Sequence, residues 1–150
     1  MKLYMGDCLE VMAGMEAQSV DAIIGDLPYG TTACKWDSVI PFAPMWEAVK
    51  HVLKPRGAFV TTASQPFTSA LIMSNVKDFR YEWIWDKTRP SGFQIAKYQP
   101  MKRHENVLVF SKESAYWQPI KEMRDKPIRG RVASRSDSSP LKYSDGIVRE

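Results

Sequence analysis

The chain reads Val20-Asp-Ala-Ile-Ile-Gly25 and continues without a break into Asp26-Leu-Pro-Tyr-Gly30. The first six residues form a short β-branched run rather than an alternating one, a pattern typical of a strand buried on both faces. The next five contain a proline and a glycine, which favour a turn. The sequence therefore predicts a buried strand that runs directly into a loop carrying a carboxylate and a phenol.

Patterns on either side of this stretch predict alternating helices and strands. Residues 8–14 favour a short helix with Asp7 as its N-cap. Apolar residues at three- and four-residue steps predict an amphipathic helix over 42–53, ended by Lys54-Pro-Arg-Gly57. The remaining expectations are a strand at 58–62, a helix at 65–75, strands at 81–85 and 106–110, and Trp46, Trp83 and Trp85 in the core. Such alternation indicates an α/β sheet with parallel crossovers.

The fold class also predicts where a site would lie. In open α/β sheets, ligands bind beyond the carboxyl ends of the strands. The turn Gly6-Asp7 follows the apolar residues 2–5, and the loop at Asp26 follows the buried strand. Neighbouring strands would place both carboxylates on the same rim of the sheet.

The composition is that of a globular protein with an uneven charge. The net charge is +4, but residues 1–75 hold five Lys/Arg against seven Asp/Glu, and residues 76–150 hold sixteen against ten. Either the second half contacts a polyanion, or it has a basic solvated surface. The two cysteines form no disulfide framework and match no metal-ligand spacing, which suits a reducing cytoplasm. No run approaches the ~18 apolar residues of a membrane span.

Asp26, Leu27, Pro28 and Tyr29 together suit chemistry on an exocyclic amine of a nucleobase. That nitrogen is a poor nucleophile because its lone pair is delocalised into the ring, and acceptors at its two hydrogens would release the lone pair. The Asp26 carboxylate and the Leu27 carbonyl are two such acceptors, and Pro28 restricts Leu27 while adding no N–H. Tyr29 could stack on a base turned out of a duplex. A plain turn after a strand would also carry these residues.

The order of these motifs resembles the opening of the β group of amino DNA methyltransferases, which carry an Asp-Pro-Pro-Tyr motif. The similarity lies in Gly6-Asp-Cys-Leu-Glu-Val-Met12, Ser19–Ile24 and Asp26–Gly30, and it continues through 42–57, Trp85-Asp-Lys87 and His104–Phe110. It covers about residues 1–112. Leu27 stands where the family has its first proline, which is tolerable if only the carbonyl acts.

The resemblance implies a partial Rossmann-like sheet of S-adenosylmethionine-dependent methyltransferases, with helices on both faces and a C-terminal antiparallel strand pair. It implies catalytic roles for Asp26, Leu27, Pro28 and Tyr29 and cofactor contacts at Asp7, Cys8 and Asp26. The residue type itself predicts a small, buried Cys8 side chain. No metal is expected. An aspartate at the first motif position favours adenine-N6 as the target, in a cytoplasmic restriction-modification setting. Cytosine-N4 or RNA amines are alternatives.

The resemblance also divides the chain into a catalytic subdomain, 1–112, and a basic, partly flexible start of the target-recognition region, 113–150. DNA contacts are expected at Lys87 and Arg89, for which an exposed hairpin insert is the alternative. They are also expected at Arg124, Lys126, Arg129, Arg131 and Arg135. A solvated arm is the alternative for the run 121–135. The family's glycine-rich Phe-x-Gly-x-Gly cofactor loop has no match in the sequence. A second chain or a missing C-terminal half would supply it, or the chain is a non-catalytic nucleic-acid-binding remnant.

Overall fold

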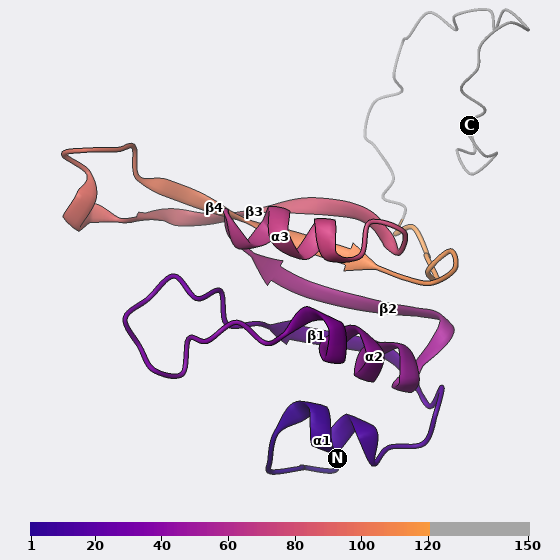
Figure 1. The fold of residues 1–150 in the computed structure, drawn as a ribbon. Helices are drawn as coiled ribbons and strands as arrows, with labels where there is room; N and C mark the ends of the chain where they lie inside the picture. The colour runs from indigo at the N-terminus through magenta and orange to yellow at the C-terminus, as the bar shows by residue number, and fades with distance from the viewer. Residues whose placement is uncertain (121–150) are drawn as a thin grey trace, which may run out of the picture. The chain divides into compact units, whose positions relative to one another are not determined.

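A computed structural model describes residues 1–120 of the chain. The elements follow the expected alternation (Figure 1). They are α1 (Cys8–Ala13), β1 (Val20–Asp26), α2 (Phe42–Val52), β2 (Leu53–Ala63), α3 (Phe67–Ser74), β3 (Phe79–Ser91), the 3-10 turn η1 (Phe93–Ile95) and β4 (Lys102–Phe110). Residues 1–118 form one compact unit. Within the described part of the chain, no helix is long and apolar enough to cross a membrane.

The four strands form one open sheet in the order β1-β2-β4-β3. β1 pairs in parallel with β2, whereas β4 is antiparallel to both β2 and β3. The mixed α/β fold is confirmed, and so is the antiparallel pair at the end of the described chain. Because β1, β2 and β3 all point the same way, their carboxyl ends meet at one edge of the sheet.

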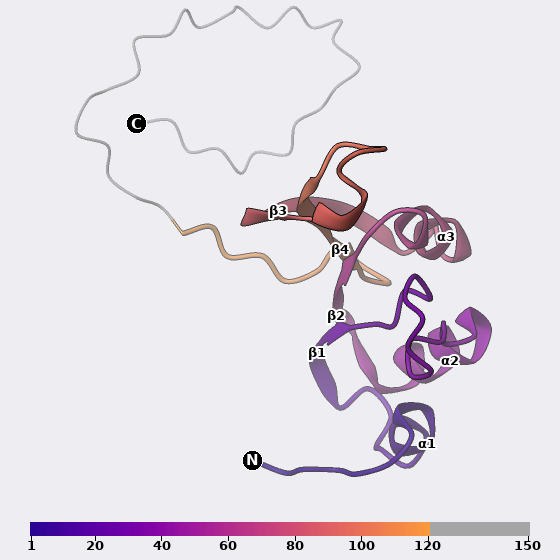
Figure 2. The ribbon, with the colours of Figure 1, turned by 90° about the vertical axis from the view of Figure 1, so that its left-hand side faces the viewer.

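The three α-helices lie on the same side of the sheet (Figure 2). Both crossovers, from β1 to β2 and from β2 to β3, move in the same direction across the sheet. Parallel crossovers are almost always right-handed, so two that move in one direction place their helices on one face. Helices on a second face, as the resemblance implied, are not found among residues 1–120. That face instead exposes Ile24 (81%), Trp83 (46%) and Trp85 (49%).

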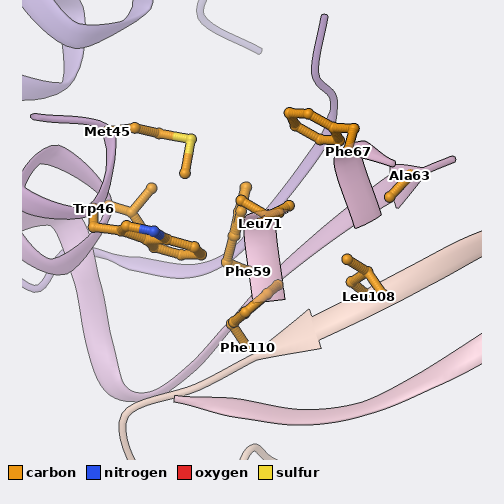
Figure 3. Packing of buried hydrophobic residues seen from close by; sticks show 9 residues of the cluster. Met45, Trp46, Phe59, Ala63, Phe67, Leu71, Leu108 and Phe110 are labelled. Atoms are coloured by element: carbon orange, nitrogen blue, oxygen red, sulfur yellow. The ribbon is translucent and has the colours of Figure 1, made fainter. Parts of the chain in front are cut away.

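The core lies between the sheet and the helices α2 and α3. Figure 3 shows Trp46, Phe59, Leu71 and Phe110 turned toward one another. Ring centroids lie 4.9 Å apart for Trp46 and Phe110, and the Trp46 indole N–H donates to Ser74 Oγ over 2.8 Å. Trp46 is therefore a core residue, as predicted, because its ring is buried and its N–H has an acceptor. The expectation that Trp83 and Trp85 are buried is wrong, because both are exposed on the face that carries no helix.

Three segments differ from the sequence-based expectation. Residues 2–5 are not a strand, so Gly6-Asp7 does not follow a strand end. β2 begins at Leu53, and the four residues expected as a helix stop are an irregularity in the ladder, because Val20 pairs with Leu53 and Ala22 with Ala58. β3 and β4 run far beyond their predicted bounds and form an extended hairpin. The outer residues of this hairpin, 86–91 and 102–105, contain no apolar alternation that would have revealed it.

Candidate active site

Asp26 is the last residue of β1 and faces Thr62 of β2 across the parallel ladder. The Thr62 hydroxyl donates to Asp26 Oδ1. The Tyr29 hydroxyl lies 3.0 Å from the same oxygen and 2.8 Å from Thr62 Oγ1, donating toward both. Asp26 is exposed, whereas Tyr29 and Thr62 are half-buried. The carboxyl ends of two strands thus hold an accessible carboxylate between two hydroxyl groups.

Tyr29 is fixed through its ring as well as its hydroxyl. The ring stacks on Phe67 of α3 with centroids 5.2 Å apart and planes at 26°. Burial raises the pKa of the Tyr29 phenol to about 12, with Asp26 adding to the rise and the Thr62 hydrogen bond opposing it. Tyr29 therefore stays protonated at neutral pH and remains a hydrogen-bond donor. Phe67 therefore contacts one face of the Tyr29 ring.

Leu27 and Pro28 set the backbone between the carboxylate and the phenol. The Leu27 side chain is half-buried and packs against the hydrophobic core. Pro28 limits Leu27 to extended conformations and brings no N–H into the loop. Leu27 is therefore anchored through its side chain and restrained by the proline that follows it. The loop therefore offers two acceptors, one charged and one neutral.

Asp37 closes the loop that follows this motif. Its Oδ1 accepts from the Gly30 amide over 2.8 Å, and its Oδ2 accepts from the Thr31 and Thr32 amides over 2.9 and 2.7 Å. A hydrogen bond with the Thr32 hydroxyl and these three amides lower the pKa of the Asp37 carboxyl to about 2. The side chain is buried. Asp37 therefore fixes the segment 30–32, next to Tyr29, as an anion does in a backbone nest.

Asp7 and Cys8 lie at the beginning of α1. Asp7 Oδ1 accepts from the amides of Leu9 (2.8 Å) and Glu10 (3.3 Å), so Asp7 is the helix N-cap, as predicted. Cys8 is the first helical residue, and its N–H belongs to the first turn, where no intrahelical acceptor exists. The expectation of a buried Cys8 side chain is wrong, because the thiol is exposed. Both residues remain available to a ligand.

The hairpin of β3 and β4 projects from the same edge of the sheet as Asp26. Lys87 pairs with Glu105 over 2.7 Å and lies 5.6 Å from the Trp85 ring centroid. Arg89 and Lys97 are exposed. Both predicted hairpin cations, Lys87 and Arg89, lie on β3. Arg124, Lys126, Arg129, Arg131 and Arg135 lie outside the described residues.

The motif alone did not reveal three side chains that complete the site, namely Thr62, Phe67 and Asp37. Thr62 could have been found, because it ends the predicted strand 58–62 and sites lie at such ends. The Asp37 carboxylate faces the amides of the loop that follows the motif. Among residues 1–120, no three His, Cys, Asp or Glu side chains gather as a metal site would require.

The four-stranded sheet and its helices form a mixed α/β fold of the methyltransferase type. No protein-family model and no curated protein matches the sequence. Among solved structures, PvuII DNA methyltransferase (cytosine-N4-specific) is 17% identical with a TM-score of 0.58, over 75% of this chain and 49% of its own. M1.HpyAVI, solved as a complex with SAM, is 21% identical with a TM-score of 0.57, over 84% and 62%. This chain therefore spans 49% and 62% of the lengths of these two proteins.

Proposed function

We propose that this chain is the catalytic part of an S-adenosylmethionine-dependent DNA methyltransferase that acts on the exocyclic amine of a flipped base. One observation carries the proposal: the exposed Asp26 carboxylate at the carboxyl end of β1 is held by the Thr62 and Tyr29 hydroxyls. The fold of PvuII DNA methyltransferase and of the SAM-bound M1.HpyAVI supports it.

The chain's own residues would activate the amine. Asp26 and the Leu27 carbonyl accept its two hydrogens, which draws the nitrogen toward tetrahedral geometry and releases its lone pair. Asp26 then stabilises the positive charge that builds up on the nitrogen and accepts the proton that the nitrogen releases. The Tyr29 ring would stack on the base. When bound, S-adenosylmethionine would supply the methyl group, which is electrophilic because it is attached to a positively charged sulfur that leaves as a neutral thioether.

Asp7 and Cys8 have the donor set that the adenosine end of this cofactor requires. Both N-cap bonds of Asp7 fall on Oδ1, so the carboxylate can also accept from a ribose hydroxyl. The Cys8 N–H, at the first helical position, can donate to an adenine ring nitrogen. The methionine end would be held by a glycine-rich loop from a further segment or a second chain, because the 150 residues contain no Phe-x-Gly-x-Gly motif.

DNA would approach along the hairpin. Arg89 and Lys97 are exposed there, and phosphate oxygens are the usual partners of such cations. The basic residues Arg124, Lys126, Arg129, Arg131 and Arg135 would add further backbone contacts. This arrangement would place the duplex over the edge of the sheet at which Asp26 lies.

We further propose adenine-N6 as the target, because Asp26 opens a motif that resembles the adenine-specific members of the family. Cytosine-N4 is the second candidate, favoured by the fold likeness to a cytosine-N4-specific enzyme. The test incubates unmethylated genomic DNA with S-adenosylmethionine and either the 150-residue chain or the complete product of its reading frame. Mass spectrometry of the digested nucleosides should detect N6-methyladenine. N4-methylcytosine would overturn the choice of base, and no methylated nucleoside in either arm would overturn the proposed function.

A further inference from the structure

The Thr62 side chain makes contacts that a sheet residue does not need. It lies on the face opposite the buried side chains of Phe59, Thr61 and Ala63, because alternate residues of a strand point to opposite faces. Thr62 donates to Asp26 Oδ1 and accepts from the Tyr29 hydroxyl over 2.8 Å. Its neighbour Thr61 is buried, and that hydroxyl donates to the Thr62 backbone carbonyl instead. The two adjacent threonines therefore have different roles.

The hydroxyl bonds converge on one carboxylate oxygen. Among residues 1–120, the bonds that the Asp26 side chain accepts come from Thr62 and Tyr29, and both fall on Oδ1. A carboxylate that is held at one oxygen can no longer rotate freely, so the direction of Oδ2 is fixed as well. Oδ2 then has its acceptor capacity free for an incoming N–H. Oδ1 is therefore the oxygen that the protein holds, and Oδ2 is the oxygen that is free to accept from a ligand.

We propose that Thr62 is a positioning residue of the methyl-transfer site, whose hydroxyl holds Asp26 Oδ1 so that Oδ2 receives the amine hydrogen. This inference rests on the proposed function. Misplacement of a reacting group by about 1 Å can lower a rate about 100-fold, so such a hydroxyl contributes to turnover without touching the base. Tyr29 supports the arrangement because its phenol stays protonated and keeps donating.

The first arm of the test does not depend on activity. Tyrosine labelled with ¹³C at Cζ gives a separate NMR signal for Tyr29, and that signal reports its hydroxyl bond. Thr62→Val removes the partner with almost no change in shape, and the Tyr29 signal should move. Thr62→Ser, which keeps the hydroxyl, and the neighbouring control Thr61→Val should leave it near the wild-type position. A Tyr29 signal that is unchanged by Thr62→Val would overturn the inference.

The second arm measures methyl transfer in the same variants, in whichever form of the chain is active. Thr62→Val should lower kcat about 10- to 100-fold while the Kd for S-adenosylmethionine changes less than about twofold, and Thr62→Ser should restore most of kcat. An unchanged kcat in Thr62→Val would overturn the positioning role and leave the proposed function standing. If the wild type itself transfers no methyl group, the proposed function fails, and the positioning role fails with it.

Discussion

Asp37 illustrates how a single residue stabilises the loop beside the site. Its carboxylate accepts hydrogen bonds from the backbone amides of Gly30, Thr31 and Thr32. Each of these amides would otherwise lack a partner inside the protein, which is costly when it is shielded from water. The loop conformation, and with it the position of Tyr29, therefore depends on the ionised form of one side chain.

The pH dependence of this loop is a prediction at the residue scale. The ordinary pKa of an aspartate is 3.8 and that of Asp37 is lowered to about 2. The ionised carboxylate therefore stabilises the folded loop fully above pH 3.8, and this contribution is lost as the pH falls through about 2. The amide NMR shifts of Gly30, Thr31 and Thr32 should titrate together with a midpoint near 2. The Asp37→Asn variant should lack this transition, and a wild-type midpoint near 4 would contradict the account.

The site residues that are neighbours in the sequence could be predicted. The site residue that strand pairing brings in from far along the chain could not. Asp26, Leu27, Pro28 and Tyr29 form one contiguous motif whose chemistry is legible in the sequence. Thr62 lies 36 positions from Asp26, and only the pairing of β1 with β2 brings them together. A one-residue slip of that pairing would turn Thr62 to the other face.

The hairpin of β3 and β4 is the element that extends beyond the candidate site. Its outer part is held by polar contacts, including a bidentate pair between Arg103 and Asp86 with both distances at 2.8 Å. This pair occupies Arg103, and Lys87 is similarly paired with Glu105. Arg89 and Lys97 are therefore the hairpin cations that we expect to contact phosphate. The β1 strand was predictable from its β-branched run and α2 from its apolar periodicity, whereas the outer residues of this hairpin carry neither pattern.

DNA binding should depend on the two exposed hairpin cations, Arg89 and Lys97. Each phosphate contact that is removed should reduce the slope of log K against log salt by about 1. The Arg89→Ala and Lys97→Ala double variant should therefore make this slope shallower by about 2, as measured by fluorescence anisotropy with a labelled duplex. Lys54→Ala is the matched control, because Lys54 lies at the start of β2 and pairs with Asp21 over 2.7 Å. Equal slopes in the double variant and the wild type would contradict a role for the hairpin.

At the scale of the whole molecule, helices cover one face of the sheet, and none of residues 1–120 forms a helix on the other face. The helices pack on one side, whereas Ile24, Trp83 and Trp85 are exposed on the other. The carboxylate site lies at the edge where β1, β2 and β3 end, and the hairpin extends from the same edge. The order of elements and the fold class could be predicted from the sequence. The one-sided helices could not, because they follow from the strand order, which no local pattern encodes.

The measurement that tests the central claim most directly compares two isosteric variants of β1. Asp26→Asn removes the charge at the carboxyl end of the strand, and Asp21→Asn removes an exposed charge near its other end. Both variants should fold, since both carboxylates are exposed. Transfer of tritium-labelled methyl groups from S-adenosylmethionine to DNA should fall at least about 100-fold in Asp26→Asn and stay near wild type in Asp21→Asn. Full activity in Asp26→Asn would contradict the account.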